Sequence, residues 1–334
     1  MQRKKDGLEA FGKRVKGRSE QVGDYLVWQP SICLRIIETL KAVALRDCPV
    51  LILGETGTGK EMVARQIHAY SSRADNIFVP VDCAALTGQL FESQLFGCVK
   101  GSFTGAVSGT LGAFRAADGG TIFLDRIEKL SLVLQAKLLS VFLESRVTPV
   151  GSTKSYPVNV RIICATDCDL RQMVRDGNFR TDLYFRINVV HLELPPLRKR
   201  KEDIIILAKY FLDRQAQLYN GHSKTLSPES KKILTSYRWP GNIQELANVM
   251  EQAYIFSDSD EIRPSELPLD IVTDDILPEQ DQGFPTLDQV KKKLVLNALK
   301  ATNGQKMAAA KLLRIDHRKL SRLIKKYNIQ YTWK

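Results

Sequence analysis

The sequence predicts an α/β fold with a parallel sheet, followed by a small all-α segment and a separate basic module. Four short apolar runs, typical of buried strands, lie at 50–53, 77–81, 119–125 and 158–165 and alternate with stretches of helical periodicity. Polar or acidic residues follow these runs, as they do where the carboxyl ends of parallel strands meet at one sheet edge. After the proline pair at 195–196, the patterns up to residue 256 are helical.

Composition places the chain among soluble proteins of more than one domain. It has 334 residues, of which 44% are hydrophobic and 26% charged, and this length allows a sizeable buried core. We see no signal peptide and no apolar run long enough to span a bilayer, so we expect no membrane partner. The six cysteines show neither C-x-x-C spacing nor a paired framework, which favours a reducing, cytoplasmic location.

The order of the patterns divides the chain into five parts. The apolar positions between 25 and 44 have the spacing of an amphipathic helix that leads into the first strand. Acidic residues and prolines are concentrated at 257–285, a composition that is typical of a linker. The predicted parts are a basic arm at 1–21, an α/β subdomain at 22–195, an all-α subdomain at 196–256, the linker at 257–285 and a basic module at 286–334.

A glycine-rich stretch with the spacing G-x-x-x-x-G-K follows the first strand, and a helical pattern begins near Lys60. Its glycines let the loop curl so that backbone N–H groups converge on phosphate oxygens, while the helix dipole and Lys60 add positive charge. Glu61 stands where Ser or Thr is usual. These features predict a nucleotide-phosphate site. We assign to it Gly54, Glu55, Thr56, Gly57, Thr58, Gly59, Lys60 and Glu61.

The apolar run at 119–125 ends in Asp125. In a protein with a phosphate-binding loop, an Asp at such a strand end holds Mg²⁺ directly or through water. We therefore assign Asp125 as the metal-binding residue.

The C-terminal module is strongly basic. Residues 286–334 carry 13 Lys and Arg against two Asp, a net +11, whereas residues 257–285 carry nine acids against one Arg, a net −8. Apolar spacing predicts short helices in this module, in an arrangement that fits a helix-turn-helix whose last helix enters the DNA major groove. The residues expected to contact DNA are His317, Arg318, Lys319, Arg322, Lys325 and Lys326.

Taken in order, these landmarks resemble the bacterial enhancer-binding proteins, transcriptional activators of the sigma-54 type. The resemblance covers about 22–334, and the motifs are specific: Gly54–Glu61 is similar to the family's GESGTGKE, and Trp239–Leu246 to its WPGNVREL. It implies an AAA+ three-layer domain with a helical lid, a Fis-type helix-turn-helix, and ATP or ADP with Mg²⁺ as cofactors. Asp167 and Gln244 fall on the family's sensor positions beside the nucleotide.

The resemblance also implies partners. The stretch at 101–106 is similar to the family's GAFTGA loop, which contacts the sigma factor of RNA polymerase. The contact residues would be Gly101, Ser102, Phe103, Thr104, Gly105 and Ala106. Arg180 and Arg186 match two arginines that reach the neighbouring subunit's phosphates, so we expect a homo-oligomer, from dimers to rings. DNA would be bound at upstream regulatory sites.

Several positions around the nucleotide depart from the family. Arg126 follows Asp125 where the family has the glutamate that polarises the attacking water, and aspartates stand at 82 and 167 in place of asparagines. Gln244 replaces the lid arginine. We do not expect Glu128 to substitute, because on an extended chain it would stand about 6.6 Å further along.

We hypothesise that Arg126 forms an ion pair with Asp167 or Asp82, independent drift of these positions being the other explanation. The leading function is a DNA-binding regulator that binds nucleotide and self-assembles, with impaired hydrolysis. One alternative is an active ATPase that remodels sigma-54 RNA polymerase through the 101–106 loop. Another is a non-hydrolysing regulator that assembles on a different phosphate ligand, such as a cyclic dinucleotide.

Overall fold

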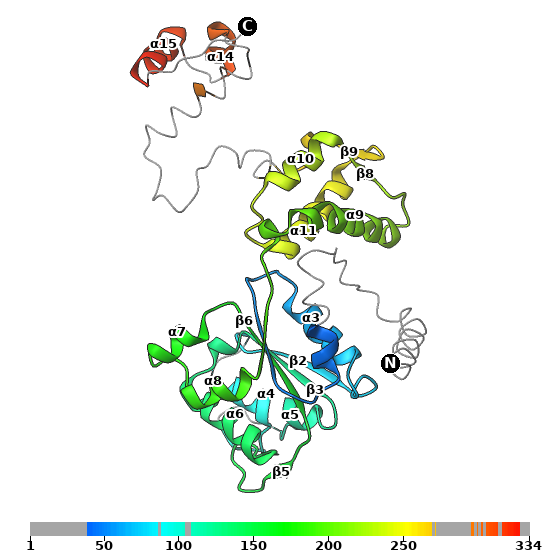
Figure 1. Cartoon of the computed structure of the whole chain (residues 1–334), viewed down its shortest axis with the longest axis vertical. Coiled ribbons are helices and arrows are strands. Elements are labelled where there is room, and N and C mark those ends of the chain that lie inside the picture. Colours follow the sequence, from blue (N-terminus) through cyan, green and yellow to red (C-terminus); the bar gives the residue numbers. More distant parts are fainter. Residues whose placement is uncertain are drawn as a thin grey trace, which may run out of the picture. The chain divides into compact units, whose positions relative to one another are not determined.

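The computed structural model describes residues 39–85, 88–103, 108–268, 271, 295–296, 299, 302, 305–312 and 316–327 (Figure 1). They fall into two units. The first runs to Ser223 and takes in Arg238–Glu251, and the second takes in Lys224–Tyr237 and the chain from Gln252 onward. The predicted basic arm at 1–21 lies outside the described residues. No helix in the described ranges has the length and apolar composition needed to cross a bilayer.

A five-stranded parallel sheet forms the centre of the first unit, in the order β2-β3-β6-β1-β7. Its strands are β1 (Val50–Leu53), β2 (Phe78–Asp82), β3 (Thr121–Asp125), β6 (Arg161–Thr166) and β7 (Val190–Glu193). The first four confirm the predicted strands, with ends shifted by a few residues. The edge strand β7 escaped prediction because it is short and places His191 and Glu193 in solvent.

Alternation along the strands builds a core on each face of the sheet. On β1, Val50 and Ile52 pack with helix α3 (Lys60–Ala69) and with the helical residues 39–44. Leu51 faces the opposite core, which holds buried side chains from five helices. These are α4 (Gly88–Phe96), α5 (Ala113–Ala116), α6 (Leu132–Glu144), α7 (Leu170–Arg175) and α8 (Thr181–Ile187). The predicted three-layer α/β architecture is therefore confirmed, and each fully buried Leu, Ile or Phe contributes about 1.5–3 kcal/mol.

Helical segments follow the sheet, as the sequence predicts. The first unit contains the short 3₁₀ helix η2 (Leu197–Lys199), α9 (Lys201–Leu218) and the first turns of α11 (Asn242–Phe256). Trp239, just ahead of α11, is fully buried. Helix α9 begins three residues before the predicted Ile204, because acidic residues at 202 and 203 suit the first turn of a helix.

The second unit contains α10 (Pro228–Ser236), which Ser227 caps by accepting a hydrogen bond from the Ser230 N–H. Its strand β8 (Thr225–Leu226) pairs in parallel with β9 (Glu261–Ile262), and the 3₁₀ helix η3 spans Pro264–Glu266. The predicted linker start at 257 is therefore wrong. Acidic composition hides the fact that Ile262 and Leu267 are buried.

Two short helices lie near the C-terminus, α14 (Lys306–Leu312) and α15 (His317–Lys326). Asp316 caps α15 by accepting a hydrogen bond from the Arg318 N–H. Buried Leu320 packs with Ala309 and Ala310 and with residues 295 and 299 to form a small separate core. This core orients α15, because Leu320 is its buried residue and the basic side chains lie on the remaining faces.

Candidate functional site

The loop between β1 and α3 owes its shape to two glycines. Gly57 and Gly59 have φ values of 78° and 93°, in the left-handed region that other residues avoid. A Cβ added to Gly57 would lie 2.1 Å from the carbonyl oxygen of Gly241. The Gly57 carbonyl accepts a hydrogen bond from the Ile243 N–H at 2.9 Å, so the loop is seated against the start of α11.

Side chains also fix this loop. The Lys60 ammonium donates to the carbonyl oxygens of Gly54 at 2.8 Å and Glu55 at 3.2 Å. The Glu55 carboxylate accepts two hydrogen bonds from Arg198, at 2.5 and 2.7 Å, and a third from Asn242. Hydrogen bonding to Arg198 lowers the pKa of Glu55 below its usual value. Glu55 therefore holds the loop in place rather than facing a ligand.

A cavity of about 790 Å³ opens beside the loop. Of the residues assigned to the nucleotide from sequence, those that line it are Thr56, Gly57, Gly59, Lys60, Glu61, Asp125, Asp167 and Gln244. Arg126 lines it too, whereas Gly54, Glu55 and Thr58 do not.

The sequence reasoning missed a group of lining residues from the helices. They are Met62, Lys129, Leu207, Tyr210, Phe211, Arg214, Ile243 and Ala247. Leu207, Phe211 and Arg214 lie four and three residues apart, a spacing that places them on one face of α9. That face was visible in the sequence, but its role as a cavity wall depends on where α9 packs.

Asp125 ends β3 and stands directly opposite Asp82 of β2 in the sheet register. Burial raises the pKa of Asp125, while the nearby Lys60 ammonium opposes this shift. The Asp125 oxygen Oδ1 accepts a hydrogen bond from the backbone N–H of Arg126 at 3.0 Å. Asp125 thus presents a half-buried carboxylate to the cavity, the ligand type that Mg²⁺ prefers.

The predicted ion pair of Arg126 is present, with Asp82 as the partner. Arg126 Nε donates to Asp82 Oδ1 at 2.9 Å, and Nη2 contacts Oδ2. Hydrogen bonding to Asp82 raises the pKa of the guanidinium. Asp167 does not share this pair. It accepts hydrogen bonds from Thr56 Oγ1 at 3.2 Å and from the Cys168 thiol at 3.0 Å.

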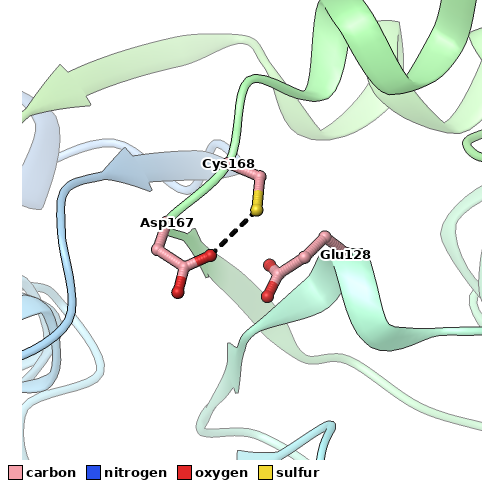
Figure 2. A group of neighbouring side chains, drawn as sticks. All are labelled: Glu128, Asp167 and Cys168. Carbon is pink, nitrogen blue, oxygen red and sulfur yellow. Dashed lines mark hydrogen bonds between the residues drawn. The ribbon is translucent and has the colours of Figure 1, made fainter. Parts of the chain in front are cut away.

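Glu128, Asp167 and Cys168 cluster behind the end of β6, with ligand atoms within 4.8 Å of one another (Figure 2). Glu128 Oε2 accepts a hydrogen bond from Thr166 Oγ1 at 2.8 Å, and Oε1 is buried without a hydrogen-bond partner. Donation to the Asp167 carboxylate raises the pKa of Cys168 to about 11. Hydrogen bonds to Asp167 and Thr166 hold the Cys168 thiol and the Glu128 carboxylate in this group.

The extended chain assumed for Glu128 is wrong. The backbone turns at Arg126 into the 3₁₀ helix η1 (Ile127–Lys129), which directs Glu128 toward Thr166. Burial raises the pKa of Glu128, and Glu128 is not among the residues that line the cavity.

Part of the stretch at 101–106 is described, namely Gly101, Ser102 and Phe103, while Thr104, Gly105 and Ala106 lie outside the described residues. Phe103 is half-buried. Ser102 Oγ is buried without a hydrogen-bond partner. Close packing on Gly151 explains part of this burial, since the Ser102 Cβ lies 2.5 Å from where a Cβ at Gly151 would stand.

Arg180 is the N-cap residue of helix α8 and Arg186 lies in its last turn, and neither lines the cavity of its own chain. Arg180 pairs with Asp182 through two hydrogen bonds of 2.7 and 3.1 Å. Arg186 donates to the carbonyl oxygen of Phe142 at 3.3 Å. On α15, the predicted DNA contacts His317, Arg318, Lys319, Arg322, Lys325 and Lys326 are all exposed.

Comparison with known families settles where the chain belongs. The model described as the sigma-54 interaction domain matches residues 26–193, half of the chain. The chain belongs to the sigma-54 interaction domain family. The AAA+ ATPase lid domain matches residues 198–282, so the AAA+ fold with a helical lid is confirmed for this sigma-54 family member.

Its relatives are transcriptional regulators. The transcriptional regulatory protein ZraR of Salmonella typhimurium is 44% identical over 85% of this chain and 65% of its own length. AlgB of Pseudomonas putida, an alginate biosynthesis transcriptional regulatory protein, is 40% identical over 96% of this chain and 71% of its own. NtrX from Brucella abortus, solved in complex with ATP, has a TM-score of 0.71 at 29% identity and covers 97% of this chain and 75% of that one. The chain thus spans about 65% of the length of ZraR.

Proposed function

We propose that the chain is a DNA-binding transcriptional regulator that binds ATP or ADP with Mg²⁺, self-assembles, and hydrolyses ATP poorly. The observation that carries this proposal is Arg126, which stands directly after Asp125, lines the cavity and is paired with Asp82. A site of this design keeps the parts that hold a nucleotide and lacks the carboxylate that would activate water.

Nucleotide binding draws on the loop and on Asp125. The N–H groups at the start of α3 and the Lys60 ammonium would receive the phosphates. Asp125 would hold Mg²⁺, which supplies charge neutralisation between the phosphate oxygens when it is bound. NtrX has been solved with ATP and with ADP, and its 29% identity to this chain supports the same ligand class here.

Slow hydrolysis follows from the carboxylates that line the cavity. Glu61 pairs with Arg65 on the next turn of α3, at 2.7 Å. Asp125 is the metal position. Hydrogen bonding from Cys168 lowers the pKa of Asp167, which makes it a weaker base. Losing a general base typically lowers a rate by about 10²–10⁴, so turnover should be slow.

Assembly and DNA binding complete the proposal. Arg180 and Arg186 would serve a neighbouring subunit's phosphates, since neither lines the cavity of its own chain. The exposed basic residues of α15 would bind DNA phosphates and the major groove, as the last helix of a helix-turn-helix, with strong salt dependence. A sigma factor of RNA polymerase is the proposed partner of the 101–106 stretch. That retained stretch also favours the second candidate, an active ATPase that remodels sigma-54 RNA polymerase.

Titration calorimetry on the full chain tests the nucleotide site. With Mg²⁺ present we expect ATP and ADP to bind. Lys60→Ala should lower the affinity for each nucleotide by about 10-fold or more, because a charged hydrogen-bond donor is lost. Thermal unfolding of the variant checks that it folds, and sedimentation with and without ATP reads out assembly. The proposal fails if neither nucleotide binds the natural chain. Binding of a cyclic dinucleotide in their place would identify the other ligand class.

A further inference from the structure

Arg126 occupies the turn between β3 and η1 in a conformation that an arginine rarely adopts. Its φ and ψ are 54° and 48°, in the left-handed region where a Cβ crowds the backbone. This turn redirects the chain immediately after Asp125. The guanidinium reaches across to β2, where Asp82 stands opposite Asp125 in the register.

The ion pair with Asp82 is open to exchange. The side chains of Arg126 and Asp82 are each 39% exposed, and pairs that remain hydrated contribute little to stability. Arg126 lines the cavity and Asp82 does not. Arg126 is therefore a cavity residue whose guanidinium is held by a carboxylate outside the lining, so an anion in the cavity would compete with Asp82 for it.

We propose that Arg126 distinguishes a nucleoside triphosphate from a diphosphate by leaving Asp82 and binding the third phosphate. This inference rests on the proposed nucleotide site. It gives a binding role to Arg126, the residue that stands in place of the catalytic glutamate. A phosphate offers the guanidinium the same two-oxygen geometry as a carboxylate and carries more negative charge. A diphosphate does not extend to this position, so Arg126 stays paired with Asp82.

The position of Arg126 determines which phosphate it meets. The loop N–H groups and Lys60 lie at the start of α3, where the first phosphates would be received. Asp125 precedes Arg126 by one residue and would hold Mg²⁺, which would neutralise charge on the outer phosphates. Arg126 therefore belongs to the terminal-phosphate side of the site.

Asp82 has a second hydrogen-bond partner besides Arg126. Asp82 Oδ1 accepts the N–H of Ala84 at 2.9 Å in addition to its bond from Arg126. Release of the guanidinium leaves Asp82 with this local bond.

Calorimetric titrations of the full chain with ATP and with ADP, each with Mg²⁺, test the proposal. Three variants are compared with the natural chain. Arg126→Gln removes the positive charge, and Arg126→Lys keeps the charge without the paired N–H donors of a guanidinium. Asp82→Asn removes the negative charge that competes with the phosphate. Lys137→Gln is the matched control, since Lys137 pairs with Glu92 on helices away from the cavity.

For the natural chain we expect ATP to bind about 10-fold more tightly than ADP or better, the ratio that one charge-assisted contact supports. Arg126→Gln should lower the affinity for ATP alone, so that ATP and ADP bind equally. Arg126→Lys should retain part of the preference for ATP, and Asp82→Asn should raise the affinity for ATP. The control should match the natural chain.

The inference is overturned if Arg126→Gln keeps the natural ratio, or lowers the affinity for both nucleotides equally. It also fails if the natural chain binds ATP and ADP equally, an outcome that leaves the proposed nucleotide site intact. Absence of binding by either nucleotide overturns the site and the inference together.

Discussion

Acidic side chains around the phosphate-binding loop are neutralised by nearby arginines. Glu55 pairs with Arg198, Glu61 with Arg65, and Asp82 with Arg126. Without these partners the carboxylates would repel an incoming phosphate. The pairs leave Lys60 facing the cavity as a buried cation on the loop, so the site favours anions although several acids surround it.

Residue-level reasoning from sequence found most of this site and missed its details. The loop and Asp125 follow from spacing, and charge predicts an ion pair of Arg126 with Asp82 or Asp167. The partner of Arg126 could not be chosen between Asp82 and Asp167, because the choice depends on the left-handed turn at Arg126. The buried position of Glu128 depends on the same turn.

Glu128 provides a stability prediction. Burial raises its pKa, so the folded protein favours the protonated carboxyl, and the natural chain loses stability as pH rises through that raised pKa. Glu128→Gln removes the charge and keeps an acceptor for Thr166. We expect the variant to be more stable than the natural chain by about 1 kcal/mol at pH 8, with a smaller difference at pH 5.5.

Urea unfolding at the two pH values measures this difference. Glu144→Gln on the exposed end of α6 is the control and should change little at either pH. At each pH the measured quantity is the unfolding free energy of Glu128→Gln minus that of the natural chain. A smaller difference at pH 8 than at pH 5.5 would contradict this description of the carboxyl.

At the scale of elements, parallel register brings the functional side chains together. The ends of β2 and β3 place Asp82 beside Asp125, and the end of β6 places Asp167 nearby. The apolar runs were sufficient to predict these strands, since β3 and β6 are buried along most of their length and the edge strand β2 is partly buried. Strands β7 and β9 were missed since their short, partly polar sequences carry no such signal.

Helix α15 depends on its cap for stability. The Asp316 carboxylate accepts the Arg318 N–H at 2.6 Å and faces the positive end of the helix. Asp316→Ala should cost about 1 kcal/mol of local stability and weaken DNA binding, measured by fluorescence anisotropy on the full chain. Asp316→Asn keeps the cap and should bind like the natural chain or better, because a negative charge is removed. Equal binding by all three proteins would show that the cap has no influence on DNA binding.

At the scale of the whole molecule, the chain combines a sigma-54 family ATPase fold with a basic C-terminal module. Composition predicted both parts and their order. The boundary at 257 was misplaced because acidic residues there surround a few buried apolar side chains, and burial cannot be read from charge. Family membership itself was predictable, since the loop motifs are long and specific.

The proposed function is that of a regulator that reads nucleotide without consuming it. The phosphate loop and metal position are retained, whereas the position of the catalytic base holds an arginine paired with Asp82. The two substitutions at 82 and 126 are complementary in charge, so reversing them together should restore part of the family's chemistry with little structural cost, while Asp167 and Gln244 still depart from the family.

Phosphate release at saturating Mg²⁺-ATP and high protein concentration tests this central claim. The natural chain should release phosphate near the background rate, and the Asp82→Asn/Arg126→Glu double variant should exceed it by about 10-fold or more. Turnover by the natural chain of ~1 s⁻¹ or faster would contradict the account, because another residue would then position the attacking water.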